Sequence, residues 1–164
     1  KLGGVNRGSL DVFFHPKSVA LIGATEKQGS VGRSILANLQ QTSFGGPLYA
    51  VNPKYTSVLG VDCFPTIVDI PGAVDLAVIV IPAACVPEAV RECVTKGVRG
   101  VVIISAGFRE TGAAGVAAER EIRDVARAAG IRVIGPNCVG VMSPHSGLNA
   151  TFAASMVNDG LSPA

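Results

Sequence analysis

The clearest pattern along the chain is a series of short apolar runs, each followed by Gly, Pro, Asn or Ser. Five such runs have the β-branched composition of strands, and they cover residues 18–22, 48–51, 75–81, 101–104 and 131–134. The run at 75–81 is continuous rather than alternating, which is typical of a central parallel strand that is buried on both faces. We therefore predict five strands.

Apolar positions between these runs recur with helical spacing. We predict helices over residues 31–41, 84–96 and 113–129, with Val31, Ile35, Leu36 and Leu39 forming the buried stripe of the first. Gly97 and Gly130 follow the second and third helices, as C-terminal glycines do. Residues 10–14 suggest a short helical turn, and residues 55–74 an irregular excursion with one helical turn. Strands alternating with helices predict an α/β fold with a Rossmann-like, doubly wound, mainly parallel sheet.

Composition and charge argue against nucleic-acid-binding and membrane-spanning classes of protein. The chain has 164 residues, enough for one domain with a real core, and 48% of them are apolar. A formal charge of +2 without a Lys/Arg run does not suggest nucleic-acid binding. The longest apolar stretch, 76–86, contains Pro82 and is far shorter than the ~20 residues of a membrane span. No apolar signal-peptide region is visible, so we expect a cytoplasmic protein with no membrane partner.

The four cysteines and two histidines form no recognisable metal or catalytic pattern. We expect no zinc site and no disulfide framework, because there is no C-x-x-C pair and no His at ligand spacing. Cys85 and Cys93 fall in a predicted helix and should pack as small hydrophobic residues. His15 and His145 lie in Pro-flanked loops without an evident acid or nucleophile partner, so we expect both on the surface.

The glycine-rich turn after the first strand is the best candidate binding element. Gly23 allows a tight turn, Ser30 is a good N-cap, and the following helix start offers free N–H groups to an anion. Thr25 stands where the dinucleotide fingerprint requires its second glycine. Lys54 lies just after the next predicted strand, 48–51, where an NAD site would carry Asp or Glu. A cation at this position suits the extra phosphate of NADP or coenzyme A. A plain strand-to-helix turn and a solvated loop lysine are the alternatives.

Parallel strands place their carboxyl ends at one edge of the sheet, where ligands of such folds bind. The segments that follow the five strands are small, polar or helix-breaking: Gly23–Thr25, Asn52–Lys54, Pro82–Ala83, Ser105–Phe108 and Gly135–Cys138. We call these segments the five tips.

Taken together, the tips resemble the N-terminal coenzyme A-binding domain of the nucleoside-diphosphate-forming acyl-CoA synthetases. This group includes the succinyl-CoA synthetase α subunit and the ADP-forming acetate–CoA ligases. The matching phrases run in the family's order over nearly the whole chain: residues 18–24, 30–33, 51–54, Gly60, 75–78, 96–97, 105–110 and 135–140. Ser-Ala-Gly-Phe-x-Glu at 105–110 fits the acetate–CoA ligase branch best.

The resemblance implies that coenzyme A, or an acyl-CoA, lies across the tips. Its phosphates would meet the first turn, its 3′-phosphate Lys54, and its thiol the fourth and fifth tips. The cofactor-binding residues implied in this way are Gly23, Thr25, Ser30, Val31, Asn52, Pro53, Lys54, Ile81, Pro82, Ser105, Ala106, Gly107, Phe108, Pro136, Asn137 and Cys138. The loop at 26–30 is longer than in succinyl-CoA synthetase, which leaves the amides that meet the pyrophosphate undecided.

The same resemblance implies partners. Family enzymes pass a phosphoryl group through a phosphohistidine in a second domain, followed by an ATP-grasp module. Neither His15 nor His145 matches that histidine. We expect an N-terminal extension at 1–17, the binding domain at 18–154 and the start of a linker at 155–164, with no catalytic residue and no turnover by this chain alone. Cys138 is best interpreted as a structural thiol, and Glu110 either orients a polar group near the thioester or is a solvated loop carboxylate.

Two alternatives remain open from the sequence. The same domain occurs as a coenzyme A- or acyl-CoA-sensing regulatory module fused to lysine acetyltransferases. An NADP-binding oxidoreductase domain is the second alternative, which Thr25 disfavours.

Overall fold

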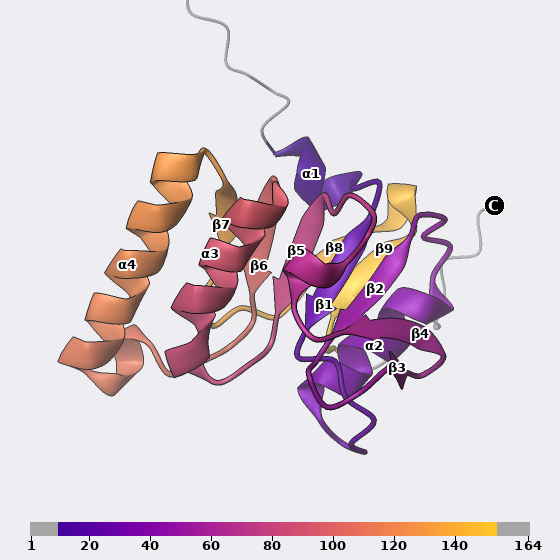
Figure 1. Cartoon of the computed structure of the whole chain (residues 1–164), viewed down its shortest axis with the longest axis horizontal. Coiled ribbons are helices and arrows are strands. Elements are labelled where there is room, and N and C mark those ends of the chain that lie inside the picture. The colour runs from indigo at the N-terminus through magenta and orange to yellow at the C-terminus, as the bar shows by residue number, and fades with distance from the viewer. Residues whose placement is uncertain (1–9, 154–164) are drawn as a thin grey trace, which may run out of the picture.

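A seven-stranded sheet runs through the middle of the molecule in the order β3-β4-β2-β1-β5-β6-β7 (Figure 1). The computed structural model describes residues 10–153. The strands of this sheet are β1 (Val19–Ile22), β2 (Leu48–Val51), β3 (Ser57–Val58), β4 (Val61–Phe64), β5 (Leu76–Ile79), β6 (Gly100–Ile103) and β7 (Arg132–Ile134). All neighbours pair in parallel except β3 and β4. The doubly wound, mainly parallel sheet is confirmed.

The central strands are buried along their whole length, as their continuous apolar runs predict. Every residue of β1, β5 and β6 is buried. Alternate residues of each strand face opposite sides of the sheet, so the sheet separates two apolar clusters. Each of these clusters needs a covering layer.

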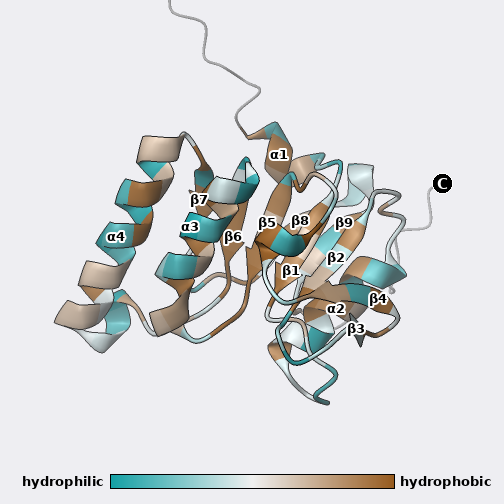
Figure 2. Ribbon diagram, in the orientation of Figure 1, coloured by the Kyte–Doolittle hydropathy of each residue, from teal (hydrophilic) through white to brown (hydrophobic). Residues whose placement is uncertain are grey.

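Two helices cover one face. These are α3 (Val86–Lys96) and α4 (Ala113–Ala129), which pack side by side (Figure 1) and turn their apolar stripes toward the sheet (Figure 2). Each ends at a glycine in the left-handed region, Gly97 at φ 81° and Gly130 at φ 70°, as expected. Cys93 of α3 is buried in this layer.

The opposite face carries a more varied layer. It consists of α1 (Asp11–Phe14), α2 (Val31–Gln41) and a hairpin of β8 (Gly140–Ser143) and β9 (Leu148–Thr151). Strand β9 packs along α2, and β8 contacts α1 and β6. Asn38 of α2 fixes the hairpin by donating from Nδ2 to the carbonyl oxygen of Thr151 at 2.8 Å.

Several expectations need correction. The prediction of five strands missed β3 and β4, which lie in the segment expected to be irregular, and also missed the β8–β9 hairpin. The turn expected in 63–71 is the 3-10 turn Ile67–Asp69, while Cys63 belongs to β4. Cys85 precedes α3 and is exposed, so it does not pack as a small hydrophobic residue. The first nine residues and the predicted linker at 155–164 lie outside the described residues.

Two further expectations concern membranes and histidines. Within residues 10–153 no helix is long and apolar enough to cross a membrane. His15 and His145 are both exposed, as expected. His15 nevertheless has an acid partner, because its Nδ1 lies 3.0 Å from the carboxylate of Asp11, one helical turn earlier.

Candidate functional site

The five tips lie along one edge of the sheet because the strands that carry them are parallel and in step. Ile22, the last residue of β1, pairs with the last residues of both neighbouring strands, Val51 and Ile79. From β1 the chain first builds β2 and β4 on one side and then returns to start β5 on the other. The point where the order reverses is where ligands of open α/β sheets bind, and the Gly23 turn lies at that point.

Glycines bring backbone onto backbone at this turn. Gly23 has φ 102° and donates its N–H to the carbonyl oxygen of Val51 at 2.9 Å. A Cβ added to Gly23 would lie 2.1 Å from the carbonyl oxygen of Val80, and one on Gly32 would lie 2.2 Å from the carbonyl oxygen of Gly23. Only glycine fits either position. The first turn of α2 is therefore seated directly against the β1 turn, with its N–H groups toward the sheet edge.

The start of α2 has the geometry of an anion site. Ser30 is its N-cap, with Oγ accepting from the N–H of Arg33 at 3.3 Å and donating to the carbonyl oxygen of Lys27 at 2.7 Å. The first N–H groups of a helix, here those of Val31 and Gly32, have no intrahelical partner. Val31 is 38% exposed and does not join the buried stripe predicted for it, which Ile35, Leu36 and Leu39 form. Its exposure leaves the helix start open to a ligand.

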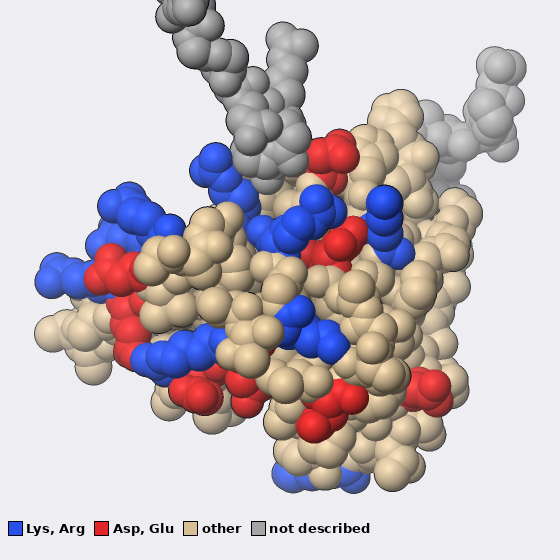
Figure 3. Space-filling model, turned by 45° about the horizontal axis from the view of Figure 1, so that its top comes forward, with Lys and Arg blue, Asp and Glu red and all other residues tan. Residues whose placement is uncertain are grey.

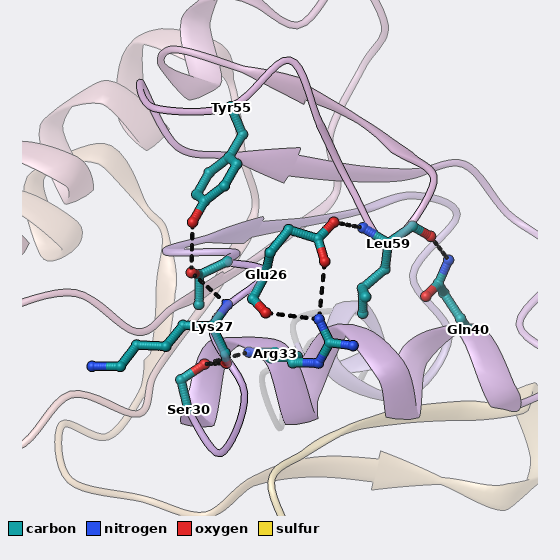
Figure 4. A network of polar contacts seen from close by, with 8 residues as sticks. Glu26, Lys27, Ser30, Arg33, Gln40, Tyr55 and Leu59 are labelled. Carbon is teal, nitrogen blue, oxygen red and sulfur yellow. Dashed lines mark hydrogen bonds and ion pairs between the residues drawn. The ribbon is translucent and has the colours of Figure 1, made fainter.

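A polar network holds the long 26–30 loop in place (Figure 4). Glu26 accepts the N–H of Leu59 at 2.7 Å, while the Arg33 guanidinium donates to both the carboxylate and the carbonyl oxygen of Glu26, at 2.9 and 2.8 Å. The hydroxyls of Thr25 and Tyr55 are 3.2 Å apart. These contacts fasten the loop to the β2–β3 connection and the β3–β4 turn. Glu26, Arg33 and Tyr55 are not among the site residues predicted from the sequence, although Arg33 lies in a matching phrase.

The second tip is joined to the first through Asn52. Its Nδ2 donates to the carbonyl oxygen of Ala24 at 2.9 Å, and its Oδ1 accepts the N–H of Lys54, also at 2.9 Å. Pro53 and Lys54 are exposed. Lys54 forms no ion pair with any residue in the described part of the chain, so it places an unneutralised cation beside the glycine turn.

The remaining three tips are hydrogen-bonded into one unit. Ser105 accepts the N–H of Ile81 at its Oγ, at 3.0 Å, and accepts the N–H of Asn137 at its carbonyl oxygen, also at 3.0 Å. The thiol of Cys138 donates to the carbonyl oxygen of Ile103 at 3.2 Å. A Cβ on Gly107 would touch that of Ala83 at 3.1 Å. This contact joins the third and fourth tips, in which the exposed residues are Pro82 and Ala106.

Side-chain burial decides what this unit can offer a ligand. Phe108 is fully buried in the core, and Ser105 is 7% exposed, so both face a ligand mainly with their backbone. Glu110 accepts the N–H of Gly107 at 2.6 Å, and this hydrogen bond lowers the pKa of its carboxyl. Through this hydrogen bond, Glu110 orients its own loop. A hollow of about 500 Å³ beside the tips is lined by Phe108, Arg109, Glu110, Glu119, Gly135, Pro136 and Asn137.

Burial keeps two thiols protonated, that of Cys138 in the fifth tip and that of Cys93 in the core beneath α3. Burial raises the pKa of Cys138, which is half-buried, and raises that of Cys93 to about 12. A reactive thiol requires a lowered pKa. Within residues 10–153 no group of three His, Cys, Asp or Glu side chains is arranged to hold a metal ion. Among the described residues, the groups that this edge offers a ligand are therefore backbone N–H groups and a lysine.

Known proteins share this arrangement. A family model described as a CoA binding domain matches residues 17–144. Acetate–CoA ligase [ADP-forming] I of Archaeoglobus fulgidus is 49% identical over 88% of this chain and 21% of its own length. The α subunit of acetate–CoA ligase [ADP-forming] II of Pyrococcus furiosus is 47% identical over 87% of this chain and 31% of its own. Among solved structures, the dinucleotide forming acetyl-coenzyme A synthetase 1 of Ca. Korarchaeum cryptofilum in complex with phosphate and ADP superposes with a TM-score of 0.83 at 36% identity, over 87% of this chain and 30% of that one. The chain thus spans between a fifth and a third of the length of these relatives.

Proposed function

The chain belongs to the family of CoA binding domains, and from this premise we propose that it is the coenzyme A-binding domain of an ADP-forming acyl-CoA synthetase. The observation that carries the proposal is the close identity to ADP-forming acetate–CoA ligases along most of the chain. The whole protein would join an acid to coenzyme A with ATP, releasing ADP and phosphate. A phosphohistidine domain and an ATP-grasp domain, in cis or as subunits, would supply the phosphoryl transfer. We expect the domain to act in the cytoplasm.

The glycine cradle at the sheet edge fits the diphosphate of coenzyme A. Gly23 and Gly32 have no room for side chains, so the start of α2 packs directly against the β1 turn. Phosphate groups are favoured at a helix N-terminus by unpaired N–H groups and the helix dipole. Thr25, Ser30 and Val31 surround the same point. Asn52 would act as a positioning residue, since both of its polar atoms are used to hold the first two tips together.

We assign Lys54 to the 3′-phosphate. Its exposure and lack of an ion pair within the described residues leave its charge available, and a charge-assisted contact to phosphate is among the stronger hydrogen bonds. Ile81, Pro82 and the joined fourth and fifth tips would then guide the pantetheine chain and its thiol. Phe108 contributes backbone only in this arrangement, because its side chain is in the core. Cys138 supports the fifth tip through its bond to Ile103.

The test is calorimetric titration of this chain with coenzyme A, acetyl-CoA and NADPH at one salt concentration. The proposal expects micromolar-range binding of coenzyme A and little binding of NADPH. Tighter binding of NADPH would instead favour the oxidoreductase alternative. Absence of binding to all three would contradict an independent binding domain, and titration of the full-length protein would then show whether other domains complete the site.

A further inference from the structure

A groove follows the edge of the sheet at β7, which pairs only with β6 among residues 10–153. Its first part, about 500 Å³, lies between α4 and β7, and its second part, about 340 Å³, passes the C-terminal ends of α3 and α4. Gly130, Ile131 and Arg132 line both parts, so the two hollows adjoin at the start of β7. We call the two together the β7 groove. It meets the tips only at Gly135 and Pro136.

The floor of the β7 groove is apolar and includes free backbone. Ile122, Ala126, Ile131 and Val133 line it between the two elements. Arg132 donates its N–H to the carbonyl oxygen of Arg99, toward β6. Because successive residues of a strand direct their N–H and C=O groups to opposite sides, those of Val133 point out of the sheet into the open edge. An added strand could pair with them.

The rim of the β7 groove is basic. Arg123, Arg127 and Arg132 line it and form no ion pair within residues 10–153, whereas its one acidic side chain, Glu119, is paired with Arg109 at 3.0 Å. Arg99 at the far end is 62% exposed beside Asp75, at 3.3 Å. Figure 3 brings this end of the molecule forward and shows Lys and Arg side chains gathered there, with acidic side chains between some of them.

We propose that the β7 groove is a docking site for an extended, acidic segment of a partner polypeptide that adds to the sheet as a strand beside β7. The main-chain groups of Val133 would give the added strand its register, the apolar floor would take alternate side chains, and the arginines would select carboxylates. A second copy of this chain fits less well, because the same unpaired arginines would be brought together. The proposal is separate from coenzyme A binding, whose residues lie at the sheet edge formed by the carboxyl ends of the strands.

The test uses short synthetic peptides of alternating valine and glutamate, or valine and lysine, titrated into ¹⁵N-labelled protein. We expect the glutamate peptide to shift the Val133 amide and slow its hydrogen exchange, and the lysine peptide to bind at least about tenfold more weakly. The double variant Arg123→Glu, Arg127→Glu should reverse the preference. Arg120→Glu, on the same helix but outside the groove lining, should not.

Three results would overturn the proposal. They are equal affinity for the two peptides, shifts that map to the tips instead of β7, and absence of binding to either peptide. Sedimentation of the unlabelled chain is a further test. If the chain forms dimers that the double variant abolishes, the occupant of the groove is a second copy and the proposal is wrong. Val133→Pro removes the outward N–H at an edge strand, where proline is tolerated, and Val133→Ala is the matched control that shortens the same side chain but keeps the N–H. Val133→Pro should weaken the glutamate peptide while coenzyme A affinity stays unchanged.

Discussion

Replacing Asn52 by Ala should uncouple the two tips that form the phosphate end of the site. The substitution removes two hydrogen bonds of 2.9 Å, one to the carbonyl oxygen of Ala24 and one from the N–H of Lys54. Each is worth about 0.5–1.5 kcal/mol net, so the free energy of unfolding should fall by about 1–3 kcal/mol. Without Asn52, part of the binding free energy must be spent on ordering the Gly23–Thr25 turn, so the affinity for coenzyme A falls. If about 1.4 kcal/mol of this is lost from binding, coenzyme A binds about tenfold more weakly.

Two companion variants make this prediction sharp. Asn52→Asp keeps an acceptor for Lys54 but puts a carboxylate oxygen against the carbonyl of Ala24, so it should be at least as damaging as Asn52→Ala. Asn38→Ala removes a comparable side-chain bond of 2.8 Å, to Thr151 in the β8–β9 hairpin, and should lower stability without changing coenzyme A affinity. Urea unfolding and calorimetry measure the two quantities. Equal loss of affinity in Asn38→Ala and Asn52→Ala would refute the reasoning.

Three further predictions follow from the same structure. Lys54→Ala should weaken coenzyme A by about 1–3 kcal/mol in calorimetry and leave dephospho-coenzyme A almost unchanged, whereas equal losses would exclude the 3′-phosphate assignment. Gly23→Ala should lower the free energy of unfolding by about 1–2 kcal/mol because of its φ of 102°, and by more because its Cβ would clash with Val80. Gly29→Ala, with φ 72° and open space, should show only the loss due to φ, as measured by urea unfolding. Cys93 has its pKa raised by burial from 9.0 to about 12, so above pH 9 the unfolded chain loses this proton first and stability should fall by about 1.4 kcal/mol per pH unit until pH 12. Cys93→Ala should reduce that slope, while Cys63 and Cys138, whose pKa values burial also raises, keep their smaller shares.

The sequence predicts best where one face of an element is strongly apolar. Helices α2 and α4 have the predicted bounds, 31–41 and 113–129, because their apolar spacing and flanking Ser30 and Gly130 agree. All five tips follow the predicted strands for the same reason. The family resemblance is likewise confirmed by the match to CoA binding domains.

The missed elements are short or carry polar residues inside the structure. Strand β9 is buried throughout although half of it is polar, because Asn149 accepts hydrogen bonds from the backbone and hydroxyl of Thr151. Leu148 and Ala150 alternate with these two polar residues, but the burial of the polar positions follows only from tertiary packing. Strand β4 pairs with β2 over only two residues. Burial of Phe108 in a glycine-containing loop also depends on tertiary packing, so its role as a ligand contact stays a prediction for its backbone alone.

The layer made of α1 and the β8–β9 hairpin has a consequence for synthesis on the ribosome. Val12 and Phe13 of α1 are buried in the same cluster as Leu148 and Ala150 of β9, and the Ser146 hydroxyl donates to the carbonyl of Phe14. Phe14 and Ser146 are 132 residues apart in the sequence, so these partners are synthesised at well separated times. Contacts of such large sequence separation slow folding, because a long loop must close before they form. The part of the sheet face that the hairpin covers therefore stays exposed during translation until residues near 151 leave the exit tunnel, and chaperones that bind exposed apolar surface have that interval in which to act.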